Sequence, residues 1–140
     1  MTPDQVKYIV LHCSDSPNSL DDTRLDDAAT IHAWHKLNDW AGIGSHYVIS
    51  EKGDLQNGRP EYWAGAHVRG HNHESIGVCL IGYGDFNPQQ WVALKRIVCD
   101  LRLKFPGAQV VGHRDLDSKK ECPGFNVALW LQGGMRALSY

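Results

Sequence analysis

Two histidines and one cysteine have the side-chain types of a hydrolytic metal site. His12 follows the apolar run 8–11, and His113 follows the apolar pair 110–111. Cys122 lies in the polar stretch that comes after His113. Zinc favours imidazole and thiolate ligands, and three protein ligands leave a fourth position open for the water that hydrolysis needs. Spacing alone does not single these residues out, because eight histidines in 140 residues produce many accidental pairs.

Short apolar runs predict the strands that would carry these residues. Residues 8–11 combine an aromatic side chain with β-branched ones, which is typical of a buried strand. Residues 76–81 are nearly continuously apolar and predict a central strand. Residues 47–49 have strand composition and precede a glycine-containing turn signal, so we expect a hairpin with a short return strand at 55–56.

Helical patterns alternate with these strands. In the segment 26–37, four apolar residues recur every third position, which predicts a helix. Asn87 and Pro88 form a helix start, an N-cap followed by proline, and apolar residues then line one face as far as Phe105. The segment 125–131 predicts a closing helix. The alternation predicts an α/β fold with a central mixed β-sheet flanked by helices.

Length, charge and cysteine content narrow the class of protein. At 140 residues the chain fits one domain, residues 1–140, and its formal net charge of -2 gives no basic field for nucleic acid or an anionic membrane. Neither a long apolar run nor an N-terminal signal sequence is evident, so we expect no stable membrane association and synthesis in the cytoplasm. The four cysteines match no disulfide framework, which favours free thiols or one metal thiolate. We expect a monomer.

Six short segments carry a resemblance to one family. Three of them are VLHCS at 10–14, GHRD at 112–115 and KECPGF at 120–125. They resemble, in order, the metal-site segments of the type 2 N-acetylmuramoyl-L-alanine amidases. That family includes phage lysozymes with amidase activity, peptidoglycan-recognition proteins and bacterial muramyl-peptide amidases. Segments 31–36, 42–49 and 72–82 also look like family segments. The similarity is greatest to phage endolysins, which share the cysteine at the third ligand position.

The resemblance implies a zinc site of His12, His113 and Cys122, with Lys120 as a catalytic side chain. It implies an endolysin that cuts the amide bond between the lactyl group of muramic acid and the first L-alanine of the peptidoglycan stem peptide, reaching the wall after membrane disruption. Zinc can polarise an amide carbonyl and lower the pKa of water, and a lysine ammonium can donate to an oxyanion. Without the motif, Lys120 would be interpreted as a solvated loop lysine beside Lys119.

Two positions depart from the family pattern and leave the general base open. Many members have a glutamate where this chain has Cys79, and members without it commonly have a tyrosine where this chain has Ser45. Either the zinc-activated water needs no strong protein base, or another group such as Tyr47 or a loop histidine serves.

The polar loop before the central strand is expected to border the substrate groove. His67 and Asn72 are the expected contacts with glycan or stem peptide. Trp40 and Trp63 lie near loops and are candidates for lining a sugar-binding surface.

Four other functions compete with hydrolysis of the intact wall. The same fold could bind peptidoglycan without cutting it, but the retained ligand residues favour an enzyme. A cytoplasmic muropeptide-recycling amidase is equally consistent with the missing signal sequence. The string 71–73, His-Asn-His, is not spread over a ββα-metal unit as a nuclease site requires, and the near-neutral charge also opposes DNA cutting. Because a phage amidase of this type binds its cognate RNA polymerase, resemblance alone adds that polymerase as a candidate partner.

Overall fold

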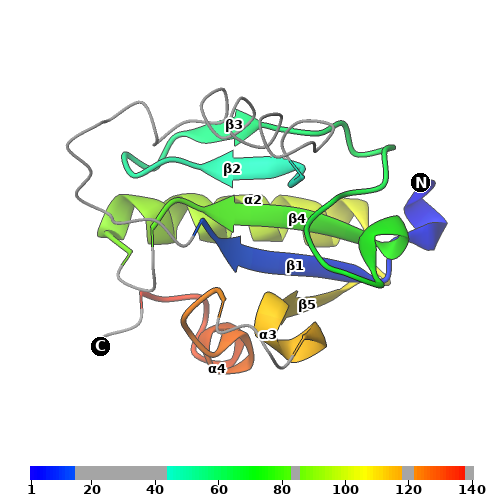
Figure 1. The fold of residues 1–140 in the computed structure, drawn as a ribbon. Helices are drawn as coiled ribbons and strands as arrows, with labels where there is room; N and C mark the ends of the chain where they lie inside the picture. The colour runs from blue at the N-terminus through cyan, green and yellow to red at the C-terminus, as the bar shows by residue number, and fades with distance from the viewer. Residues whose placement is uncertain (15–43, 83–85, 118–121, 138–140) are drawn as a thin grey trace.

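A five-stranded sheet forms the centre of the part of the chain that the structure describes. The computed structural model describes residues 1–14, 44–82, 86–117 and 122–137. Within these ranges the strands follow the order β3-β2-β4-β1-β5 across the sheet (Figure 1). The strands are β1 (Tyr8–Cys13), β2 (Tyr47–Ile49), β3 (Leu55–Asn57), β4 (Ser75–Leu80) and β5 (Gln109–Gly112).

The pairing confirms the predicted mixed sheet. β1 pairs in parallel with both β4 and β5, and β2 pairs in parallel with β4. The edge strand β3 runs antiparallel to β2, which is the predicted hairpin. β1 continues beyond the predicted end, because His12 and Cys13 stay in register with Cys79 and Leu80 of β4. His12 therefore lies one residue before the end of the strand, close to the strand end at which the sequence places it.

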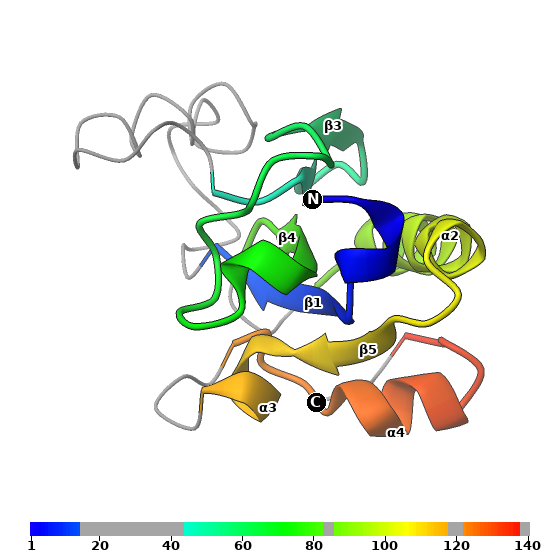
Figure 2. The same ribbon diagram turned by 90° about the vertical axis from the view of Figure 1, so that its right-hand side faces the viewer.

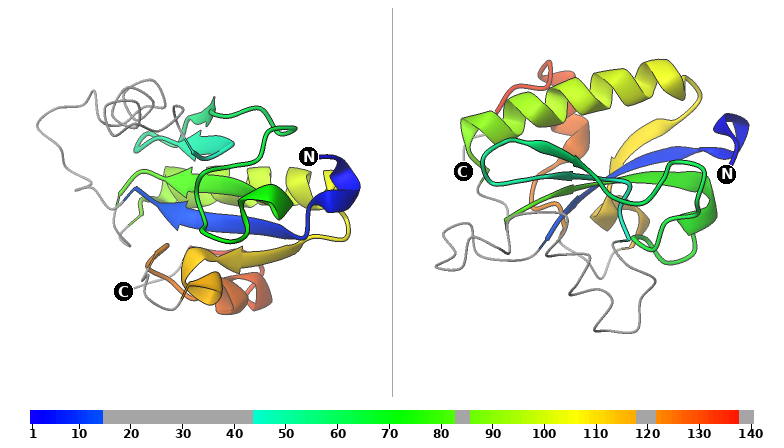
Figure 3. Two further views of the ribbon diagram at one scale, coloured as in Figure 1. Left: turned by 45° about the vertical axis from the view of Figure 1, so that its right-hand side comes forward. Right: turned by 90° about the horizontal axis from the view of Figure 1, so that it is seen from above.

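Side-chain alternation gives the sheet two different faces. Ile9 and Leu11 of β1 belong to the main core, together with Leu94 and Trp130 from the covering helices. Helix α2 (Pro88–Lys104) lies along this face, and the segment leading into β4 lies on the opposite side (Figures 2 and 3). Successive residues of a strand point to opposite faces, so His12 projects to the face away from α2. This second face carries the candidate chemistry.

The predicted helices that fall in the described ranges are present. Helix α2 begins behind Asn87, whose side chain accepts a hydrogen bond of 2.9 Å from the Gln90 backbone N–H. In return, the side-chain oxygen of Gln90 accepts a hydrogen bond of 3.1 Å from the Asn87 backbone N–H, which completes a capping box. Helix α4 (Val127–Gln132) is the closing helix, and its Trp130 is fully buried. The predicted helix at 26–37 lies outside the described residues.

Replacing Asn87 with alanine should lower the free energy of unfolding by about 1 kcal/mol, because the Gln90 backbone N–H loses its acceptor. Urea denaturation followed by circular dichroism measures this loss. The exposed Gln89 lies in the same first turn, and its replacement by alanine provides the control. Equal urea midpoints for the two variants would show that the cap does not stabilise α2.

Three short helices have no counterpart in the sequence prediction. They are the 3-10 turns η1 (Pro3–Gln5) and η3 (Asn72–Glu74) and the one-turn helix α3 (His113–Leu116). Segments this short carry too little apolar periodicity to be recognised. Among the helices of the described ranges, none has the length and apolar content to cross a membrane.

Candidate metal centre

His12, His113 and Cys122 converge at one end of the sheet. Nδ1 of His12 lies 3.0 Å from Nδ1 of His113. One nitrogen or sulfur atom from each of the three residues falls within 4.8 Å of the others. His12 is buried, while His113 and Cys122 are half-buried, so the cluster opens toward solvent on one side. The three residues singled out by type and motif are thus neighbours in space.

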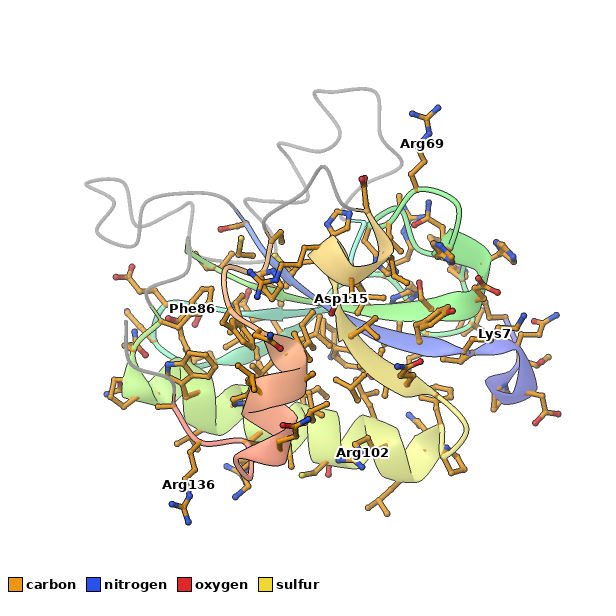
Figure 4. The ribbon with its side chains drawn as sticks, turned by 90° about the horizontal axis from the view of Figure 1, so that it is seen from below. Lys7, Arg69, Phe86, Arg102, Asp115 and Arg136 are labelled. Carbon is orange, nitrogen blue, oxygen red and sulfur yellow. The ribbon has the colours of Figure 1, made fainter. Side chains whose placement is uncertain are left out.

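Local hydrogen bonds fix the two segments that follow β5. The Gly112 N–H donates to a side-chain oxygen of Asp115 at 2.8 Å, which closes the turn in which α3 begins at His113. Asp115 lies at the junction of β5 and α3 (Figure 4). The Arg114 N–H donates to the Cys122 carbonyl at 2.8 Å and ties the cysteine segment to the histidine segment. Parallel pairing of β5 with β1 then brings both segments beside His12.

The donor set fits a zinc ion. Two imidazole nitrogens held at about 2.0–2.1 Å from zinc in a tetrahedral arrangement are about 3.3 Å apart, close to the observed 3.0 Å between the two Nδ1 atoms. The backbone N–H of Cys13 donates to Cys122 Sγ at 2.7 Å, which would stabilise a thiolate. Two nitrogens and one sulfur also leave a fourth position, as in hydrolytic zinc sites.

Burial favours the ligand form of the histidine and opposes that of the cysteine. Burial, followed by the nearby His67 and His113, holds the pKa of His12 well below its usual value, so the ring is neutral. A hydrogen bond with the Cys13 side chain, reinforced by burial, raises the pKa of the Cys122 thiol, and the Cys13 backbone N–H opposes this shift only in part. Metal binding at this site must therefore be coupled to loss of the Cys122 proton.

The two expected substrate-contact residues have structural partners. The side-chain oxygen of Asn72 accepts the backbone N–H groups of His67 at 2.8 Å and Val68 at 2.9 Å. This amide therefore holds the loop in shape. The ring of His67 contacts His12 through a 2.8 Å bond between Nδ1 and Nε2. Contact of His67 and Asn72 with glycan or stem peptide stays a prediction.

The structure also places the residues considered as a general base. Cys79 is buried beside His12, and burial raises its pKa to about 12, so it stays a thiol near neutral pH. Ser45 is buried. Tyr47 packs against the core on the α2 side, and its hydroxyl donates to Glu61. Tyr47 therefore lies on the wrong face of the sheet to act at the metal centre.

Some expected site residues fall outside the described ranges. Lys120 and Trp40 belong to this group. Trp63 is described, with 49% of its surface exposed, and it forms an edge-to-face pair with the exposed Tyr62. The His12–His67 bond was missed by sequence reasoning, because the two residues are 55 positions apart and no motif spacing joins them.

The sequence is similar to a known protein family and to phage proteins. The Amidase_2 family, described as N-acetylmuramoyl-L-alanine amidase, matches residues 2–125. The endolysin of Enterobacteria phage K11 is 34% identical over 138 residues, covering 93% of this chain and 88% of the relative.

Solved structures with the same fold include an endolysin amidase and a recognition protein. The N-acetylmuramoyl-L-alanine amidase LysCS from Clostridium intestinale has a TM-score of 0.78 and 27% identity, covering 94% of this chain and 86% of its own. A mutant of Drosophila PGRP-LB in complex with tracheal cytotoxin has a TM-score of 0.73 and 24% identity, covering 95% of this chain and 84% of its own. By the extent of the family match and the identity to the phage relative, the chain belongs to the N-acetylmuramoyl-L-alanine amidase family.

Proposed function

We propose that this protein is a zinc-dependent amidase that hydrolyses the bond between the lactyl group of muramic acid and the first L-alanine of peptidoglycan. The observation that carries the proposal is the convergence of His12, His113 and Cys122 in a member of the amidase family. A binding module of the same fold would not need a buried histidine and a thiol in an arrangement that leaves the fourth coordination position of a zinc ion free for water.

The chain's own residues supply the setting for hydrolysis. Zinc, when bound, polarises the scissile carbonyl and makes water a stronger nucleophile near neutral pH. His12 and His113 would hold the ion through their Nδ1 atoms, and Cys122 through its thiolate. The Cys13 N–H, 2.7 Å from the sulfur, disperses the negative charge of that thiolate. Lys120 is proposed to donate to the oxyanion that forms when the amide carbonyl is attacked.

The proposed biological role is that of a phage endolysin. The phage relative named above carries the name endolysin, and the protein would act on the host wall once the membrane is disrupted. Peptidoglycan is the proposed partner, supported by the PGRP-LB structure in complex with tracheal cytotoxin. His67 and Asn72 are proposed to contact this substrate.

Metal analysis combined with mass spectrometry of digested peptidoglycan tests the amidase proposal. We expect one zinc per chain and release of stem peptides with a free N-terminal L-alanine, with loss of activity after chelation. Peptidoglycan binding without any released peptide would assign the chain to the non-catalytic binding modules. Release of fragments cut elsewhere in the peptide would overturn the proposed bond.

A second comparison separates two biological roles for the same chemistry. An endolysin should digest intact sacculi, whereas a recycling amidase should strongly prefer free muropeptides. Equal enzyme concentrations on the two substrates give the ratio of initial rates. A strong preference for the soluble fragments would favour the recycling role. Co-purification with the host RNA polymerase tests the candidate polymerase partner separately.

A further inference from the structure

A chain of hydrogen bonds leads away from His12 on the side opposite the metal centre. Nε2 of His12 lies 2.8 Å from Nδ1 of His67. Nε2 of His67 lies 3.1 Å from the hydroxyl oxygen of Ser75. That hydroxyl donates in turn to the backbone carbonyl of His71 at 2.8 Å. The chain thus connects a proposed ligand to a fixed backbone acceptor through two side chains.

The carbonyl at the far end sets the direction of every bond in the chain. A serine hydroxyl has one hydrogen, and Ser75 gives it to the His71 carbonyl, so Ser75 must accept from the N–H at Nε2 of His67. A neutral imidazole carries one N–H, which leaves a lone pair on Nδ1 of His67. That lone pair accepts the Nε2 hydrogen of His12. Nδ1 of His12 is then unprotonated and faces His113.

Two glycines form a slot that holds the His67 ring in place. A Cβ atom at Gly65 would lie 2.1 Å from Cδ2 of His67, and a Cβ atom at Gly77 would lie 2.8 Å from its Cγ. Any side chain at either position would therefore overlap the ring. Ser75 is fully buried, so water does not compete for its hydroxyl. Few other orientations are open to His67.

We propose that His67 is a positioning residue that, together with Ser75, fixes the tautomer and orientation of His12 so that Nδ1 presents a lone pair to the metal. The proposal rests on the metal site of the proposed function. Partners of this kind fix the ring of a ligating histidine and increase its basicity. A residue that only contacted substrate would change KM and leave metal affinity unaltered, so the two roles of His67 are separable.

The tautomers can be measured in the zinc-free protein by two-bond proton–nitrogen NMR correlations of the histidine rings. We expect both His12 and His67 to carry hydrogen on Nε2. In Ser75→Ala, His67 should lose this single tautomer. Ser50 is a matched control, since it is also buried and its hydroxyl oxygen accepts the Asp54 backbone N–H, outside the series of hydrogen bonds that begins at His12. Hydrogen on Nδ1 of His12 in the unaltered protein would overturn the proposal without touching the amidase assignment.

Zinc affinity, measured by competition with a chromophoric chelator, tests the consequence. His67→Ala should weaken zinc binding by roughly 10–100-fold. His67→Asn should recover part of the loss, because its amide oxygen can accept from His12. Ser75→Ala should weaken zinc binding by a smaller factor, and Ser50→Ala should leave it unchanged.

The outcomes distinguish this inference from the proposed function. Unchanged zinc affinity in both His67→Ala and Ser75→Ala would overturn the positioning role while leaving a zinc amidase intact. An increase in KM alone would assign His67 to substrate contact and also overturn the positioning role. Failure of the unaltered protein to bind zinc would overturn both, whereas zinc binding without hydrolysis would overturn the amidase activity alone.

Discussion

Replacing Cys122 with serine is expected to strip most of the zinc from the protein and to abolish most amidase turnover. A serine hydroxyl does not ionise near neutral pH and is a far poorer zinc ligand than a thiolate. The Cys13 N–H, which lies 2.7 Å from the sulfur, would also lose its charged acceptor. Loss of a direct ligand should cost more zinc affinity than the roughly 10–100-fold typical of an outer partner. Metal analysis after dialysis, together with peptide release, measures both effects.

The chain offers a matched control for this substitution. Cys99 is a half-buried free thiol on α2, on the other side of the sheet from His12. Cys99→Ser should therefore keep one zinc per chain and full turnover. Zinc retained at one per chain in Cys122→Ser would remove Cys122 from the site, whatever the effect on activity.

The parts of the fold that the sequence predicts are those with a local signal. Helix α2 has an N-cap, a proline and a long apolar stripe, and all three lie within one segment. β4 is predicted because a nearly continuous apolar run is typical of a parallel strand buried on both faces. In the structure, Ser75–Leu80 is buried throughout. α3 is missed because its single turn is made by Gly112 and Asp115, which have no periodic pattern around them.

The candidate site divides in the same way. Motif position identifies His12, His113 and Cys122, and the structure brings them together. Tyr47 could not be excluded as a base from its type, because only the register with β4 and the contact with Glu61 show which face it occupies. The contact of His67 with His12 depends on how the segment between β3 and η3 passes over strand β1. Such contacts between distant segments leave no spacing rule in the sequence.

The second large effect is expected at Lys120, whose replacement by alanine should lower kcat by roughly 10²–10³ while zinc stays bound. The ammonium can stabilise the oxyanion of the tetrahedral intermediate, and an interaction made mainly in the transition state lowers kcat more than it raises KM. Steady-state kinetics on soluble muropeptides and metal analysis of the same sample measure this separation. Lys119→Ala removes the same charge from the neighbouring position and should have little effect.

Ser45→Ala provides the comparison that tests the proton transfers. A serine hydroxyl is a poor base without help, so this variant should lose much less kcat than Lys120→Ala. The substitution also preserves the hydrogen bond of 2.9 Å from the Arg59 backbone N–H, since the acceptor is the Ser45 backbone carbonyl. If Ser45→Ala proves as damaging as Lys120→Ala with zinc still bound, the serine hydroxyl must hold a water or substrate group in place. The expectation that the Lys120 charge contributes most to catalysis, and that Ser45 does not act as a base, would then be wrong.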